Sequence, residues 1–162
     1  MNKNFLIKNI NLNITSDSKF WSKKIKKTKK IIKSVLLNNK YFVNKKCKIY
    51  NICFLLTDNK KIKILNKKYN NKPKATDVLT FINYQKINDK IIKFADIAIS
   101  GNMIKSDANK LKIDFYDHFT HIVIHALLHS NNYMHDTNKK FNEMRKIEIN
   151  ILKLMNIENP YI

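Results

Sequence analysis

The chain has 162 residues, 44% of them hydrophobic, which predicts one domain over residues 1–162 with a hydrophobic core. No segment approaches the roughly 18 uninterrupted apolar residues of a membrane span, and the first residues lack the apolar region of a signal peptide, so we expect a cytoplasmic protein without a membrane partner. The formal net charge of +20 favours a polyanionic partner, most often nucleic acid, although genomic drift towards A and T would also enrich lysine.

Strands and helices are predicted from the spacing of apolar residues, because side chains alternate along a strand and recur every three to four residues along a helix. The predicted elements are, in chain order, a strand over residues 5–14, a helix over 18–37, a strand over 48–56, a helix capped by Thr57 or Asp58, strands over 78–82 and 91–100, and helices over 102–111, from Asp114 onwards, and over 138–155. Asn88 and Asp89 indicate a turn between the two later strands. This order predicts an α+β fold, a single layered domain with a mixed β-sheet of about four strands covered by helices.

All five histidines lie between residues 118 and 135, on or just after the helix that begins at Asp114. His125 and His129 are four residues apart, so their imidazoles project from one face of the helix and can reach a single ion. His121 and His129 are about 12 Å apart along the helix axis, which is too far to share an ion. The helical pair of ligands is therefore 121/125 or 125/129.

The third ligand decides between these pairs. Asn132 can end the helix after His129, because asparagine tolerates the left-handed conformation that a helix-terminating residue often adopts. His135 can then turn back towards the ion, which selects His125, His129 and His135 as the ligands. Three nitrogen ligands and one open position are typical of catalytic zinc, so we expect one Zn²⁺ per chain, held on a buried helix. The other two histidines become packing residues or partners of the ligands.

The spacing of the three histidines is similar to that of the metzincin proteases, which place a general-base glutamate directly after the first histidine. Here that position is Ala126, so peptide hydrolysis is disfavoured. A zinc ion with three histidine ligands can still generate a nucleophile from water at neutral pH or polarise a phosphoryl oxygen. The residues therefore predict a zincin-like, metal-activated hydrolase whose catalytic general base is unknown.

Three ordered blocks of the sequence, residues 65–81, 95–100 and 125–135, carry further motifs. They contain Leu65-Asn66-x-x-Tyr69 with Thr76-Asp77-Val78-Leu79, then Asp96-Ile97-x-Ile99-Ser100, then His125-x-x-Leu128-His129 with Tyr133-x-His135. These blocks resemble the motifs of the YbeY family, bacterial zinc-dependent endoribonucleases that act in rRNA maturation, whose signature is His-Gly-x-Leu-His-Leu-x-Gly-Tyr-Asp-His. The departures from the family pattern are Ala126 and Asn132 in place of glycines, Met134 in place of an aspartate, and Asn70 in place of an arginine.

The resemblance implies a single-strand-specific, metal-dependent endoribonuclease acting in 16S rRNA 3′-end maturation and ribosome quality control. Its partners would be rRNA and the small ribosomal subunit, with no second protein chain evident. The candidate RNA-binding residues beside the metal are Lys67, Lys68, Lys72 and Lys74, and for Asp77 we expect a hydrogen bond that fixes the loop. Asparagine cannot grip a phosphate through two parallel hydrogen bonds as arginine can. Asn70 therefore favours the alternative, a ribosome-binding assembly factor with a structural zinc and weak or no nuclease activity.

Overall fold

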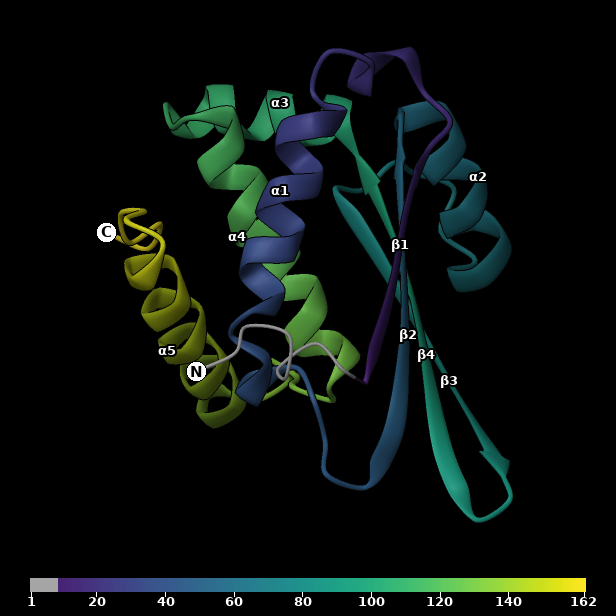
Figure 1. Ribbon diagram of the computed structural model, residues 1–162. Helices are drawn as coiled ribbons and strands as arrows, with labels where there is room; N and C mark the ends of the chain where they lie inside the picture. Colours follow the sequence, from purple (N-terminus) through teal and green to yellow (C-terminus); the bar gives the residue numbers. More distant parts are fainter. Residues whose placement is uncertain (1–8) are drawn as a thin grey trace.

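The computed structural model describes residues 9–162, and it has an α+β architecture in which helices cover a four-stranded sheet (Figure 1). The elements are, in chain order, β1 (Ile10–Ser16), α1 (Ile25–Leu36), β2 (Cys47–Thr57), α2 (Asn59–Asn70), β3 (Val78–Ile87), β4 (Lys90–Ser100), α3 (Gly101–Leu111), α4 (Phe115–Ser130) and α5 (Asn138–Leu154). Short 3-10 helices precede and follow α1, at Lys19–Trp21 and Asn39–Tyr41. None of the described helices is both long and apolar enough to cross a membrane.

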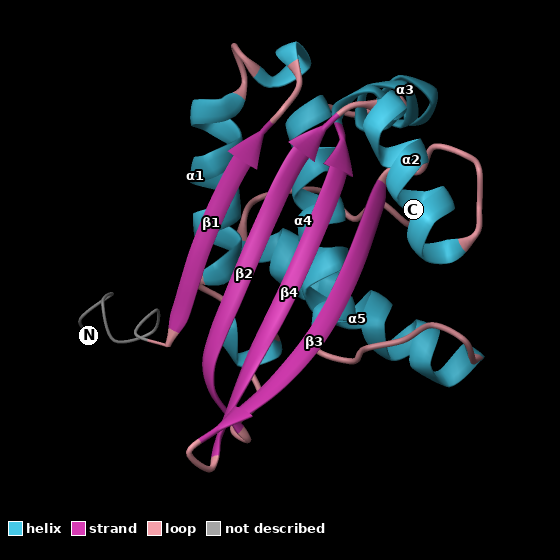
Figure 2. Ribbon diagram, turned by 90° about the vertical axis from the view of Figure 1, so that its right-hand side faces the viewer, coloured by secondary structure: helices cyan, strands magenta, loops and turns pink. Residues whose placement is uncertain are grey.

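The four strands lie side by side in the order β1-β2-β4-β3 (Figure 2). β1, β2 and β4 are parallel to one another, and β3 is antiparallel to β4, so the mixed sheet predicted above is confirmed. Asn88 and Asp89 join β3 to β4 with φ angles of 47° and 60°. Two successive left-handed residues give the turn whose twist matches that of a hairpin, which also confirms the predicted turn.

The core lies between the sheet and one layer of helices. α1 and α4 cover one face of the sheet, α5 packs against α4 on the same side, and α2 covers the other face (Figure 1). Ile52 and Phe54 of β2 point towards α4, as do Ile97 and Ile99 of β4, and each is at most 2% exposed. α4 is itself buried on most sides, with seven apolar core residues: Phe119, Ile122, Val123, Ile124, Ala126, Leu127 and Leu128. The histidine helix is therefore held firmly between the sheet and two other helices.

The two N-terminal elements differ in their bounds from those predicted. Residues 5–8 of the first predicted strand lie outside the described residues, and β1 continues to Ser16. The helix predicted over residues 18–37 is interrupted, because a 3-10 turn ends at Trp21 and α1 begins only at Ile25. The Trp21 side chain is fully buried, and its Nε1 donates a hydrogen bond to the backbone oxygen of Thr57 at 2.8 Å. This anchor to β2 sets the path of the chain before α1.

Gly101, the only glycine of the sequence, lies against Trp21 and its neighbour Phe20. A Cβ added at Gly101 would lie 2.2 Å from Cδ1 of Phe20 and 2.9 Å from Cε2 of Trp21. The first residue of α3 must therefore lack a side chain for this packing to form.

Lys93 is a buried lysine near the start of β4. Its side chain is 2% exposed, and its Nζ lies 5.7 Å from the ring centroids of both Tyr50 and Tyr84, its partners on the neighbouring strands. The ion pairs found within residues 9–162 do not include Lys93. Burial lowers the pKa of Lys93, because an apolar environment disfavours the charged form.

The lowered pKa of Lys93 predicts a specific dependence of stability on pH. Between the lowered pKa and the ordinary value near 10.4, the folded protein binds fewer protons than the unfolded chain, so the free energy of unfolding should rise with pH. Lys93→Met removes the charge and should raise the free energy of unfolding by about 1 kcal/mol at neutral pH. This advantage should shrink as the pH approaches the ordinary pKa of lysine.

Urea unfolding of the wild type and of Lys93→Met at several pH values measures this difference. Lys90→Met, at an exposed position of the same strand, is the control and should stay within about 0.5 kcal/mol of the wild type. An advantage of Lys93→Met that is equally large near pH ~10 would contradict the role given to the charge.

Candidate metal centre

His125, His129 and His135 converge at the C-terminal end of α4. Each offers one ring nitrogen, and the three nitrogens lie within 4.8 Å of one another. Nε2 of His125 is 2.9 Å from Nε2 of His129. Zinc–nitrogen bonds of about 2.0–2.1 Å in a tetrahedral site would separate two nitrogens by roughly 3.3 Å, so a small shift of these side chains suffices. The three histidines can hold one metal ion, and exposed His135 makes the cluster accessible from its side.

A tight turn after α4 brings His135 back to the helix. Asn132 has a left-handed backbone with φ 66°, and its N–H donates to the backbone oxygen of His129 at 3.0 Å. The N–H of Tyr133 donates to the oxygen of Leu128 at 3.1 Å, which completes a Schellman motif. The predicted role of Asn132 as the left-handed residue at the helix end is confirmed.

A buried carboxylate on α5, that of Glu148, lies behind the cluster and is only 1% exposed. Its Oε1 is 2.7 Å from Nδ1 of His125, and its Oε2 is 3.2 Å from Nε2 of His121. The hydroxyl of Tyr161 also donates to this carboxylate. Because an ionised carboxylate only accepts hydrogen bonds, Nδ1 of His125 carries the proton and the lone pair of its Nε2 faces His129.

The electrostatics of the cluster keep these groups in the forms that bind metal. Burial would raise the pKa of Glu148, but hydrogen bonds from His121, His125 and Tyr161 lower it to about 2. Burial, and then the charges of His125 and His135, lower the pKa of His129 to about 4. Near neutral pH the carboxylate is ionised and His129 is neutral, the state in which an imidazole coordinates a metal.

Glu148 and Tyr161 were not found from the sequence, although Glu148 left a signal there. Met144 and Ile151 lie on the buried stripe of α5, and Glu148 occupies the same stripe, four residues after the first and three before the second. A carboxylate on an apolar stripe is costly unless it is paired, so its position indicates a partner. Tyr161 lies beyond the last helix, where Nη2 of Arg145 donates to its backbone oxygen at 3.0 Å.

The remaining two histidines of α4 have different surroundings. His121 contacts Glu148, the carboxylate that orients His125, and is thus linked to the ligand only through that carboxylate. His118 is 7% exposed and lines a cavity of about 820 Å³, and neither of its ring nitrogens has a hydrogen-bond partner within residues 9–162. Burial lowers the pKa of His118, so this ring packs as a neutral group.

The lysines predicted to bind RNA lie at the end of α2 and in the loop after it, on the other layer of the fold. The four residues Lys67, Lys68, Lys72 and Lys74 are all exposed. Nδ2 of Asn66 donates to the backbone oxygen of Lys74 at 2.9 Å, which holds the loop against α2. Oδ1 of Asp77 accepts from the N–H of Val78 at 2.8 Å and from the hydroxyl of Thr76 at 3.0 Å, in the loop-fixing role expected. Contact between these lysines and RNA stays a prediction.

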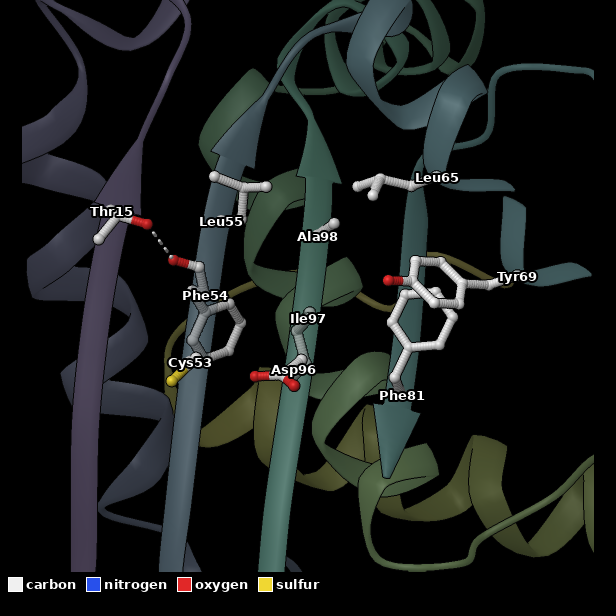
Figure 3. Close-up of a pocket in the computed structure, with 10 residues that line it drawn as sticks. All are labelled: Thr15, Cys53, Phe54, Leu55, Leu65, Tyr69, Phe81, Asp96, Ile97 and Ala98. Atoms are coloured by element: carbon white, nitrogen blue, oxygen red, sulfur yellow. Dashed lines mark hydrogen bonds between the residues drawn. The ribbon is translucent and has the colours of Figure 1, made fainter. Parts of the chain in front are cut away.

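A separate cavity of about 410 Å³ lies on the α2 face of the sheet (Figure 3). The rings of Tyr69 and Phe81 lie together on one side of it, with centroids 4.9 Å apart. Cys53 and Asp96 lie next to each other on β2 and β4. Burial, and then the Asp96 carboxylate, raise the pKa of the Cys53 thiol, so it stays protonated and is a poor nucleophile. None of the histidines lines this cavity, which is therefore distinct from the metal centre.

Known proteins resemble this chain over most of its length. A family model described as endoribonuclease YbeY matches residues 13–156. An endoribonuclease YbeY of Pelagibacter ubique is 37% identical over 150 residues, which cover 90% of this chain and 96% of that protein. Another, of Wigglesworthia glossinidia brevipalpis, is 33% identical over 162 residues, which cover 99% of each chain. A solution structure of a Thermotoga maritima protein, 18% identical, has the same fold, with a TM-score of 0.50 over 94% of this chain and 96% of that one.

The contact between Glu148 and His125 predicts a weaker metal affinity for Glu148→Gln. The carboxamide has the size of the carboxylate, but its NH₂ group can donate to Nδ1 and so favour the wrong tautomer of His125. Affinity for a divalent ion should fall by about 10- to 100-fold. Competition with a chelating dye measures this affinity, and Glu143→Gln, at an exposed position of the same helix, is the control. Equal affinities of the two variants would show that Glu148 does not position the ligand.

Proposed function

The chain belongs to the family of the endoribonuclease YbeY, and on this premise we propose that it is a single-strand-specific, metal-dependent endoribonuclease. The observation that carries the proposal is the convergence of His125, His129 and His135, whose nitrogens lie within 4.8 Å of one another. The proposed role is maturation of the 3′ end of 16S rRNA and ribosome quality control in the cytoplasm. Its partners would be rRNA and the small ribosomal subunit.

Zn²⁺, at one ion per chain, suits this set of ligands. Imidazole nitrogens are common zinc ligands, whereas Mg²⁺ and Ca²⁺ prefer oxygen, and three protein ligands leave a position for water or substrate. The bound ion would supply a Lewis acid that polarises a phosphoryl oxygen and generates a nucleophile from water at neutral pH.

The surrounding residues prepare the site for this chemistry. Glu148 holds His125 in one tautomer, so its Nε2 is presented to an ion with only a small shift of the side chains. His121 and Tyr161 hold the carboxylate of Glu148 in place. The exposure of His135 gives an RNA strand access to the cluster. Lys67, Lys68, Lys72 and Lys74, on the α2 side of the sheet, are more distant candidates to attract the RNA backbone as point charges.

RNA cleavage and metal content test the proposed function together. The purified protein should contain about one zinc per chain and cleave single-stranded RNA, and a chelator should abolish cleavage. The double variant His125→Ala/His129→Ala should lose its zinc, and its cleavage rate should fall more than about 100-fold. His118→Asn, a substitution on the same helix at a histidine outside the cluster, should keep its zinc.

Elemental analysis and cleavage of a labelled precursor of 16S rRNA provide the two measurements. A full zinc content in the double variant would overturn the ligand assignment. A zinc-loaded wild type that binds RNA but does not cleave it would overturn the nuclease.

One observation favours a second candidate function, a ribosome-binding assembly factor in which zinc serves structure and nuclease activity is weak or missing. Asn70 stands where the family pattern has an arginine, and its Nδ2 donates to Oδ1 of Asn66 at 3.0 Å. This amide is thus bonded within α2 and lacks the charge and planar fork that hold a phosphate.

Asn70→Arg separates the two functions. If a missing phosphate contact limits a working nuclease, the variant should cleave RNA about 10- to 100-fold faster, the range of a hydrogen bond to a charged group. Asn109→Arg, at an exposed position of α3, adds the same charge elsewhere and is the control. Absence of cleavage in wild type and variant alike, with intact association with the small subunit, would favour the assembly factor.

A further inference from the structure

The positive charge of this chain is concentrated in one segment. Residues 18–57 contain twelve lysines and no aspartate or glutamate, so a quarter of the chain carries +12 of the formal net charge of +20. Genomic drift towards lysine would spread along the sequence, and it would not remove acidic residues from 40 consecutive positions. This segment therefore has a charge pattern of its own that composition does not explain.

α1 displays part of this charge on a single face. Ile32 and Val35 are fully buried on its inner side. Four exposed lysines, spaced three and four residues apart, form a lysine stripe on its outer side: Lys26, Lys29, Lys30 and Lys33. None of the ion pairs found within residues 9–162 involves a lysine of residues 18–57. The stripe is thus a row of positive charges without a carboxylate to neutralise it.

α1 packs along α4 on the side of that helix away from the histidines, which face α5. Nζ of Lys27 lies 3.7 Å from the ring centroid of Tyr116, so the first turns of α1 and α4 are neighbours. After α1, the backbone oxygen of Tyr41 accepts a hydrogen bond of 2.9 Å from Nδ2 of Asn131, the residue that follows α4. α1 and α4 therefore run side by side in the same direction (Figure 1). Exposed Lys40, next to Tyr41, extends the row of charges beyond the C-terminal end of α1.

We propose that the lysine stripe and Lys40 form a track that binds the backbone of single-stranded RNA on the side of α4 away from the histidine cluster. The choice of RNA as the ligand rests on the proposed function, whereas binding by the stripe can be tested without cleavage. RNA is favoured over an anionic membrane, because the apolar side of α1 is buried under α4 and cannot insert into lipid. Lysines that contact phosphates position a strand but do not read its sequence, so the track should accept any sequence.

Two sets of lysine substitutions in the full chain test the track. The stripe variant changes Lys26, Lys29, Lys30 and Lys33 to glutamine, and the control variant changes Lys105, Lys110, Lys146 and Lys153, which are exposed on α3 and α5. Both variants lose the same charge, and glutamine keeps the helix propensity of lysine. Fluorescence anisotropy with a 2′-O-methyl oligonucleotide of mixed sequence measures binding without cleavage, and circular dichroism checks the fold.

The stripe variant should bind the oligonucleotide at least about tenfold more weakly. The slope of log affinity against log salt should become shallower by about 0.7 for each phosphate that the variant no longer neutralises. The control variant should stay within about threefold of the wild type, since screening weakens distant charges. A third variant with arginine at the four stripe positions should retain the affinity.

Two results would overturn the track: equal losses in the stripe and control variants, or unchanged RNA binding in the stripe variant. The assay measures binding and not cleavage, so the two proposals can fail separately. A wild type without nuclease activity would contradict the proposed function but not the RNA-binding stripe. Unchanged binding in the stripe variant would contradict the RNA-binding stripe but not the proposed function.

Discussion

The arrangement of the histidine helix depends on one buried carboxylate, that of Glu148. It accepts hydrogen bonds from His125 and His121 on α4 and from Tyr161 beyond α5, so it joins three parts of the chain. A buried charge is tolerated only when its hydrogen bonds are satisfied, and here both carboxylate oxygens have donors. The same bonds orient His125 before any ion arrives. Folding of α5 onto α4 and preparation of the metal centre are therefore one event.

Local patterns predicted most of the fold and the ligand set, whereas contacts between distant residues were out of reach. The strands and helices follow from apolar spacing, and the return of His135 follows from one asparagine next to a helix end. Glu148 is 23 residues from His125, and their meeting depends on how two helices pack. The interruption before α1 likewise depends on the hydrogen bond from Trp21 to Thr57, 36 residues away. Spacing along the chain indicates that Glu148 needs a partner, but it does not identify the partner in either contact.

The fold places the lysines on different sides of the sheet, a difference that the overall count of lysines does not show. Lys67 and Lys68 were singled out because they lie within a family motif, and α2 places them on one side of the sheet. The lysines of α1 belong to no such motif, yet α1 packs along the helix that carries the histidines. An excess of lysine therefore becomes interpretable only when each residue is assigned to a layer and a helix face.

Six residues other than glycine have left-handed backbones among the described residues: Asn71, Asn88, Asp89, Lys112, Asn132 and Asn156. Such a conformation strains most side chains, and asparagine tolerates it best, so the folded state gives up some stability at these turns. The scarcity of glycine has the opposite effect on stability through the unfolded state. A chain with a single glycine has fewer backbone conformations to lose on folding, so it loses less conformational entropy. The stability of this protein is consequently set in part by the restricted conformational entropy of its unfolded chain, which no interaction in the native structure reveals.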